Sequence, residues 1–114
     1  MLDYEKLDVY RCSLEFLSFA LRLATRMPKG YSYLGDQLRR AATAIPLNIA
    51  EGTGKVTAPD RAHFHAIARG SAMECGALVD VAGILGLANE SEKRDAKDLV
   101  VRIVSMLSKM CLYR

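Results

Sequence analysis

The chain has 114 residues, of which 51% are hydrophobic and 25% are charged, a size and composition typical of one soluble domain. Sixteen lysine and arginine residues against thirteen acidic residues give a formal net charge of +3, too small an excess to establish nucleic-acid binding. No uncharged stretch approaches the roughly 20 apolar residues of a membrane-spanning helix, and the acidic N-terminus does not resemble a secretory signal. We therefore expect one domain over residues 1–114, without membrane contact and in the cytoplasm.

Helical periodicity dominates the chain, and no convincing strand alternation interrupts it. The pattern predicts helices at about residues 5–26, 33–51, 59–86 and 90–112. In the first helix, spacings of three and four predict a core face, widened by Phe16 and Phe19, that consists of Leu7, Tyr10, Leu14, Leu17, Leu21 and Ala24. Four amphipathic helices with short connections favour an all-α, antiparallel up-down four-helix bundle.

Local signals mark the predicted helix ends. The apolar register of the second helix continues across Pro46, which predicts a kink in one helix, and Gly52 and Gly54 are typical of its C-terminus. Asn89 followed by Glu92 is the pattern of a capping box at the start of the fourth helix.

Apolar residues also lie on the sides of the second and third helices that point away from the predicted core. Such residues are typical of a surface buried against another subunit. The pattern therefore predicts self-association into a homo-oligomer through Tyr33, Ala44, Leu47, Met73, Ala77 and Ile84.

No arrangement of reactive side chains indicates catalysis or metal binding, so we expect a protein that is not an enzyme and needs neither metal nor cofactor. His63 and His65 are two apart on a helix and point in different directions, which favours solvated or capping roles over metal ligation. The three cysteines lie far apart on mostly apolar faces and are interpreted as buried free thiols.

Basic residues gather between residues 20 and 40, and they are the candidate contacts for RNA or DNA: Arg22, Arg26, Lys29, Arg39 and Arg40. Arg69 joins them as a residue expected on the outer side of the third helix. Glu74 is expected at the flank of the core face, where a partly buried carboxylate needs a partner. Arg39 is the interpretation that we favour for that partner.

Two sequence blocks carry a resemblance to a known family. Residues 37–52 read QLRRAATAIPLNIAEG, and residues 64–74 read FHAIARGSAME. Both blocks closely resemble the bacterial 23S rRNA intervening-sequence family of four-helix-bundle proteins, and a general likeness extends from about Leu7 to Gly86. Leu87 departs from the family pattern, which commonly has an aromatic residue there. The signature residues transferred to this chain are Arg39, Arg40, Asn48, Glu51, Gly52, Arg69, Gly70, Ser71 and Glu74.

The resemblance implies a ring-like homopentamer. It also implies a relation to the basic accessory proteins of diversity-generating retroelements, which bind nucleic acid and a reverse transcriptase. Two functional hypotheses stay open at this point. One is an oligomeric protein that binds RNA or DNA through its basic surface, and the other is a protein-protein interaction scaffold without a nucleic-acid role.

Overall fold

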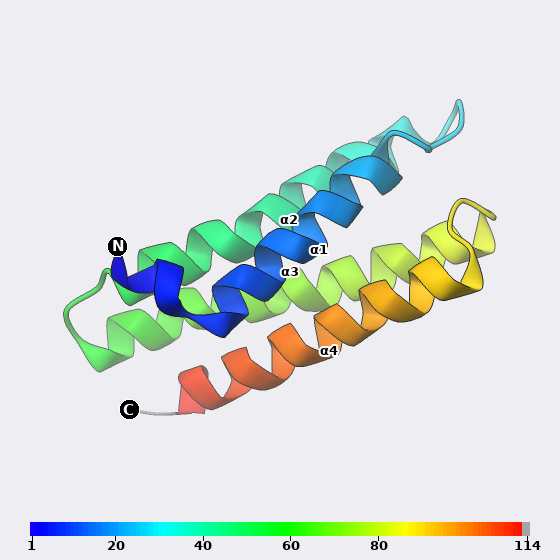
Figure 1. The fold of residues 1–114 in the computed structure, drawn as a ribbon. Coiled ribbons are helices and arrows are strands. Elements are labelled where there is room, and N and C mark those ends of the chain that lie inside the picture. Colours follow the sequence, from blue (N-terminus) through cyan, green and yellow to red (C-terminus); the bar gives the residue numbers. More distant parts are fainter. Residues whose placement is uncertain (113–114) are drawn as a thin grey trace.

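The computed structural model describes residues 1–112 as a short 3-10 helix (Asp3–Lys6) followed by four α-helices. These are α1 (Asp8–Ala24), α2 (Ser32–Thr53), α3 (Ala58–Ile84) and α4 (Glu90–Leu112). No strand occurs among the described residues, which confirms the all-α class with four helices. The helices lie along a rod of 45 × 26 × 24 Å. The α1–α2 and α3–α4 connections are at one end, and the N-terminus, the α2–α3 connection and the end of α4 are at the other (Figure 1).

Two predicted helix boundaries are wrong, for reasons that lie in the backbone. Helix α1 covers 8–24 instead of 5–26, because Leu7 is extended (φ −81°, ψ 129°) and separates it from the 3-10 helix. Helix α3 ends at Ile84 instead of residue 86, because Gly86 has a left-handed φ of +73°. This backbone lets the Leu87 amide donate to the Ala82 carbonyl at 3.0 Å, a bond that closes the helix end.

Two local predictions agree with the structure. Helix α2 runs without a break through Pro46. At the start of α4, the Glu92 amide donates to Asn89 Oδ1 at 2.8 Å, and the Asn89 amide donates to Glu92 Oε1 at 3.2 Å. These reciprocal bonds are the predicted capping box, and they satisfy amides that have no partner inside the helix.

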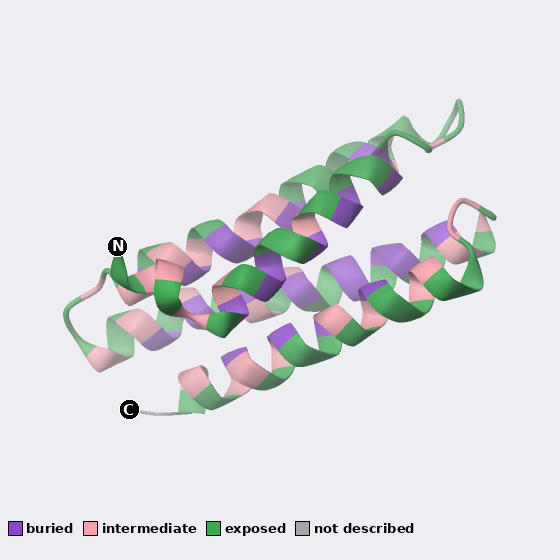
Figure 2. Cartoon of the chain, viewed as in Figure 1, coloured by how far each residue is buried: buried purple, intermediate pink, exposed green. Residues whose placement is uncertain are grey.

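The core lies between the four helices, where the inward sides of the ribbon are buried (Figure 2). Its largest buried side chains come from every helix and include Phe16, Leu23, Leu38, Ile45, Ile49, Val79, Ile103 and Leu107. The predicted core face of the first helix is partly wrong, because Leu14 and Leu21 are each 42% exposed. Helix α1 carries more apolar surface than its contacts with α2 and α4 cover, and the side with the two phenylalanines is the one that packs inward.

None of the helices in the described part of the chain is both long enough and apolar enough to cross a bilayer.

Candidate functional site

A groove of about 440 Å³ runs along the outside of the bundle between α2 and α3. We call it the α2–α3 groove. It contains three residues of the family signature, Arg40, Ser71 and Glu74, beside two of the predicted interface residues, Tyr33 and Ala44. The remaining lining residues are Gln37 and Ala41. The structure therefore brings parts of both sequence blocks together on one surface.

The partner of Glu74 is not the one expected from sequence. Gln37 Nε2 donates to Glu74 Oε2 at 2.8 Å, and Glu74 is exposed. Arg39 instead pairs with Asp36 one turn away on its own helix, at 3.0 Å. The prediction of an Arg39–Glu74 pair is wrong because the carboxylate lies over the groove, next to α2 at the level of Gln37. Sequence reasoning missed Gln37, although its position one turn before Arg40 on the same face is a usable signal.

Arg69 does not lie on the outer side of α3. It is half-buried, and its Nε donates to Ser108 Oγ on α4 at 2.7 Å. Ser108 Oγ in turn donates to the Val104 carbonyl at 2.7 Å. The expected outward position is wrong, because α4 packs against this side of α3. In this position the Arg69 side chain links α3 to α4 by a hydrogen bond.

The structure divides the predicted basic cluster. Arg26 is paired with Glu92 of α4 through two bonds of 2.9 and 3.1 Å, and one of its guanidinium nitrogens also donates to the Leu87 carbonyl. These bonds hold the pKa of Glu92 below its ordinary value, since they favour the carboxylate. Arg39 is likewise neutralised by Asp36. Lys29 is exposed in the α1–α2 connection, and Arg22 donates to Ser18 Oγ.

Acidic groups lie beside the remaining basic ones. A depression of about 210 Å³ at the α1–α4 surface is lined by Arg22 together with Glu15, Glu92 and Asp95. Because α4 starts at the end of the rod where α1 finishes, its N-terminal carboxylates share that end with Arg22 (Figure 1). The surface around Arg22 is therefore mixed in charge.

The predicted interface residues are largely uncovered in a single copy of the chain. Tyr33, Leu47, Met73 and Ile84 are 59%, 68%, 55% and 87% exposed, Ala77 is exposed and Ala44 is half-buried. We call these residues, with the α2–α3 groove, the outer α2–α3 face. It combines large apolar side chains with the polar residues of the groove.

The other signature residues fall into two groups. Near the end of α2, Asn48 Nδ2 donates to the Ala44 carbonyl at 2.8 Å, and Glu51 pairs with Lys55 at 3.2 Å. Gly52 is buried inside α2, and a Cβ there would lie 2.8 Å from the His65 ring. Gly70 is exposed on α3, and a Cβ there would meet nothing within 4 Å. Gly52 thus has a role in internal packing, whereas Gly70 has none within residues 1–112.

The structure also places the titratable residues that sequence reasoning considered for chemistry. His63 is exposed, but His65 is only 4% exposed, so the expectation of two solvated or capping histidines is wrong for His65. Burial raises the pKa of Cys75 to about 12, and the charge of Glu74 adds to this effect, so its thiol is protonated at neutral pH. No cluster of three or more potential metal-ligating side chains is found within residues 1–112.

One comparison with known proteins identifies a family. The family described as 23S rRNA-intervening sequence protein matches residues 5–109 of the chain. The match spans both signature blocks, the whole of α1, α2 and α3, and α4 as far as Lys109. A comparison with curated proteins gives no match. The chain belongs to the 23S rRNA-intervening sequence protein family.

Proposed function

We propose that this chain is a non-enzymatic scaffold whose antiparallel bundle assembles with copies of itself through the outer α2–α3 face. The observation that carries the proposal is the exposure of Leu47, Met73 and Ile84, at 68%, 55% and 87%, around a groove that holds signature residues. Single exposed apolar residues are common, but a group of them beside polar groups is typical of an interface. The expected assembly is a ring-like homopentamer in the cytoplasm, and the number five rests on the resemblance to the family.

The polar residues of the groove support this proposal. The side chains of Arg40 and Ser71 have no hydrogen-bond partner among residues 1–112, and the Glu74 side chain has one, Gln37. They are therefore available to pair with polar groups of a neighbouring copy, and in a ring those groups belong to a different patch of that copy. Gly70 adds a further reason: an interior glycine costs a helix roughly 0.5–1 kcal/mol, and no packing within the described part of the chain offsets that cost. A glycine there allows another helix to approach closely.

Replacing Leu47 or Met73 by aspartate tests the assembly. Each variant places a charge in the proposed interface, where its desolvation opposes association. We expect light scattering at micromolar concentration to change from a multiple of 12.6 kDa to the 12.6 kDa of one copy, with an unchanged helical circular dichroism spectrum. Val101→Asp is the matched control, since Val101 is 61% exposed on α4. An oligomer that tolerates both α2 and α3 variants would remove this face as the interface.

Nucleic-acid binding is a second candidate, favoured by exposed cations without an acidic partner. The Arg40 side chain has no partner within the described chain, Lys29 is exposed, and the one side-chain hydrogen bond of Arg22 is to a serine. A ring repeats these residues in every copy, and the net charge of +3 is multiplied accordingly. Arg26, Arg39 and Arg69 contribute little to such a surface, because each is held by a group within the chain.

Fluorescence anisotropy with structured RNA and duplex DNA at low and moderate salt tests the second candidate. We expect affinity to fall steeply with salt, and combined Arg22→Gln, Lys29→Gln and Arg40→Gln changes to reduce the logarithmic salt slope by about one for each phosphate that the protein no longer neutralises. Arg102→Gln is the control, an exposed residue of α4 outside the cluster. Absence of binding at low salt by the assembled protein would leave the scaffold without a nucleic-acid role.

A further inference from the structure

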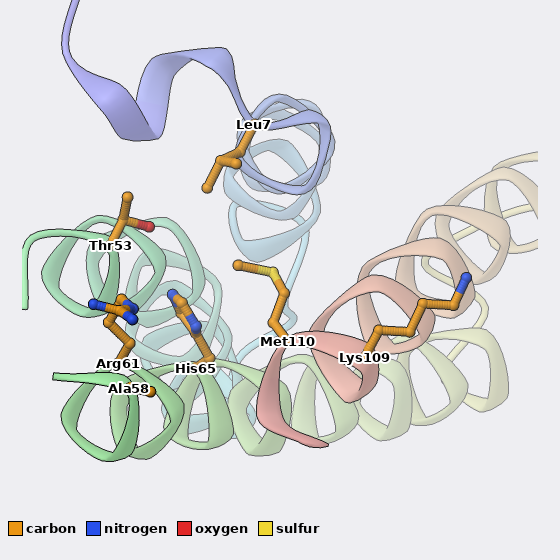
Figure 3. A pocket seen from close by; sticks show the side chains of 7 residues that line it. All are labelled: Leu7, Thr53, Ala58, Arg61, His65, Lys109 and Met110. Carbon is orange, nitrogen blue, oxygen red and sulfur yellow. The ribbon is translucent and has the colours of Figure 1, made fainter. Parts of the chain in front are cut away.

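A second cavity, separate from the α2–α3 groove, opens at the end of the rod that holds the α2–α3 connection. It has a volume of about 490 Å³ and is lined by residues from the start of the chain and from α2, α3 and α4: Leu7, Thr53, Ala58, Arg61, His65, Lys109 and Met110. This volume is in the range of roughly 300–1,000 Å³ that is common for small-molecule sites. Figure 3 shows Leu7, Thr53, His65 and Met110 around one shared space.

His65 is the unusual residue of this cavity. It is only 4% exposed, and its Nε2 has no hydrogen-bond partner within residues 1–112. The ring extends from α3 toward the space between Thr53 and Met110 (Figure 3). The ring therefore forms part of the cavity wall, while its Nε2–Cδ2 edge lies against Gly52 of α2, where an added Cβ would be 2.8 Å from both atoms.

The charge of the cavity favours an anion. Arg61 and Lys109 line it, and no carboxylate of the described residues does. One guanidinium nitrogen of Arg61, Nη1, donates to the Lys55 and Val56 carbonyls at 3.1 and 2.7 Å, whereas its Nε and Nη2 have no partner in the described chain. The guanidinium lies beside the imidazole, and Lys109 extends away from the shared space (Figure 3). Arg61 is thus the cation best placed to meet a ligand.

The protonation of His65 limits how strongly the site attracts anions. Burial, supported by the charge of Arg61, holds the pKa of His65 below its ordinary value, although the Ile49 carbonyl opposes the shift. The ring is therefore neutral at neutral pH and carries one N–H group. With a neutral imidazole, Arg61 is the cationic donor beside the shared space, and its few open N–H groups suit a carboxylate with two acceptor oxygens better than a phosphate.

The opposite wall is apolar. Leu7 and Met110 face each other across the space, and Met110 has a flexible side chain that adapts to the shape of its neighbour (Figure 3). We propose that this cavity binds a small carboxylic acid with an apolar tail. The carboxylate accepts hydrogen bonds from the unpartnered N–H groups of Arg61, beside the wall that the His65 ring forms, and the tail packs against Leu7 and Met110.

Octanoate and octanol, titrated into the whole protein, test the proposal because they share the tail and differ in the carboxylate. We expect octanoate to shift the His65 ring signals in ¹H–¹³C NMR saturably and octanol to bind about tenfold more weakly, as expected for the loss of a charge-assisted hydrogen bond. The exposed His63 is an internal control, and its signals stay in place. Equal binding of the two compounds, or a His65 ring that does not respond to saturating octanoate, would overturn the proposal.

Two variants separate the polar and apolar parts of the site. Arg61→Gln is expected to weaken octanoate about tenfold and to leave octanol unchanged. Because this variant also removes the bonds to Lys55 and Val56, Met110→Trp is the second test, since it fills the apolar wall and is expected to weaken both compounds. Arg94→Gln on the exposed side of α4 is the control. The oligomeric mass is read in parallel, so that failure here is distinguished from failure of the proposed assembly.

Discussion

The variant Phe16→Ala is expected to lose about 3–5 kcal/mol of unfolding free energy, which is a large part of the stability of a domain this size. Phe16 has no exposed surface and packs beside Phe19, with ring centroids 6.3 Å apart. Truncation leaves a cavity that the surrounding helices fill only in part. Urea denaturation followed by circular dichroism measures the loss, at one fixed protein concentration because assembly shifts the apparent stability.

Leu14→Ala is the matched control for this experiment. Leu14 lies two residues away on α1, is 42% exposed, and belongs to the face that the spacing alone predicts to be buried. A loss below about 1 kcal/mol is expected, since only part of the side chain leaves an apolar environment. Comparable losses for the two variants would mean that the assembled protein buries the second face of α1 as deeply as the first.

The second large effect is expected at Gly52. A methyl group there would lie 2.8 Å from Cδ2 and Nε2 of His65 and 3.0 Å from the Arg61 carbonyl oxygen. Alanine raises helix propensity by about 1 kcal/mol, but overpacking typically costs about 1–3 kcal/mol, and here a buried ring and a backbone oxygen must both move. We therefore expect Gly52→Ala to lower the melting temperature, by about 4 °C for each kcal/mol lost.

Two further variants test whether the loss of stability at Gly52 has a steric cause. Gly70→Ala is the matched control for a single copy: within the described chain the added methyl group has open space, so at concentrations where the copies are dissociated it is expected to stabilise the fold by up to about 1 kcal/mol. In a His65→Ala background, Gly52→Ala is expected to lower the melting temperature less, because the ring that the added methyl group would meet is gone and only the Arg61 carbonyl oxygen remains. A Gly52→Ala protein as stable as the Gly70→Ala protein would contradict the steric argument.

The helices were predictable from sequence because each level of the pattern agrees with the others. Apolar spacing, the capping box of Asn89 and Glu92, and the continuous register across Pro46 all point to the elements that the structure contains. Their ends were less predictable, since they depend on single backbone conformations such as the left-handed Gly86. The buried face of α1 was also mispredicted, because leucines and phenylalanines surround that helix and spacing does not rank them.

For the candidate site residues, the sequence predicted exposure well where it depends on a single helix, and predicted partners poorly where they come from another helix. The exposure of Tyr33, Leu47 and Met73 follows from helical geometry and the position of the core. The partners of Arg69 and Glu74 come from other helices, and their choice depends on how far one helix is shifted along its neighbour. The burial of His65 depends on Gly52, because the absence of a side chain there lets the His65 ring lie close to α2. The spacing of apolar residues along a helix does not predict such a contact between two helices.

The N-terminus and the end of α4 leave the rod at the same pole (Figure 1). Fluorophores attached at these two positions would therefore sit close together and report unfolding as a loss of energy transfer. A reporter protein fused at either position would emerge beside the ligand cavity, while the pole that carries Lys29 stays clear of it. Immobilisation through a terminal tag is thus suited to measuring binding at the distant pole, and a label in the α1–α2 connection is suited to measuring ligand entry.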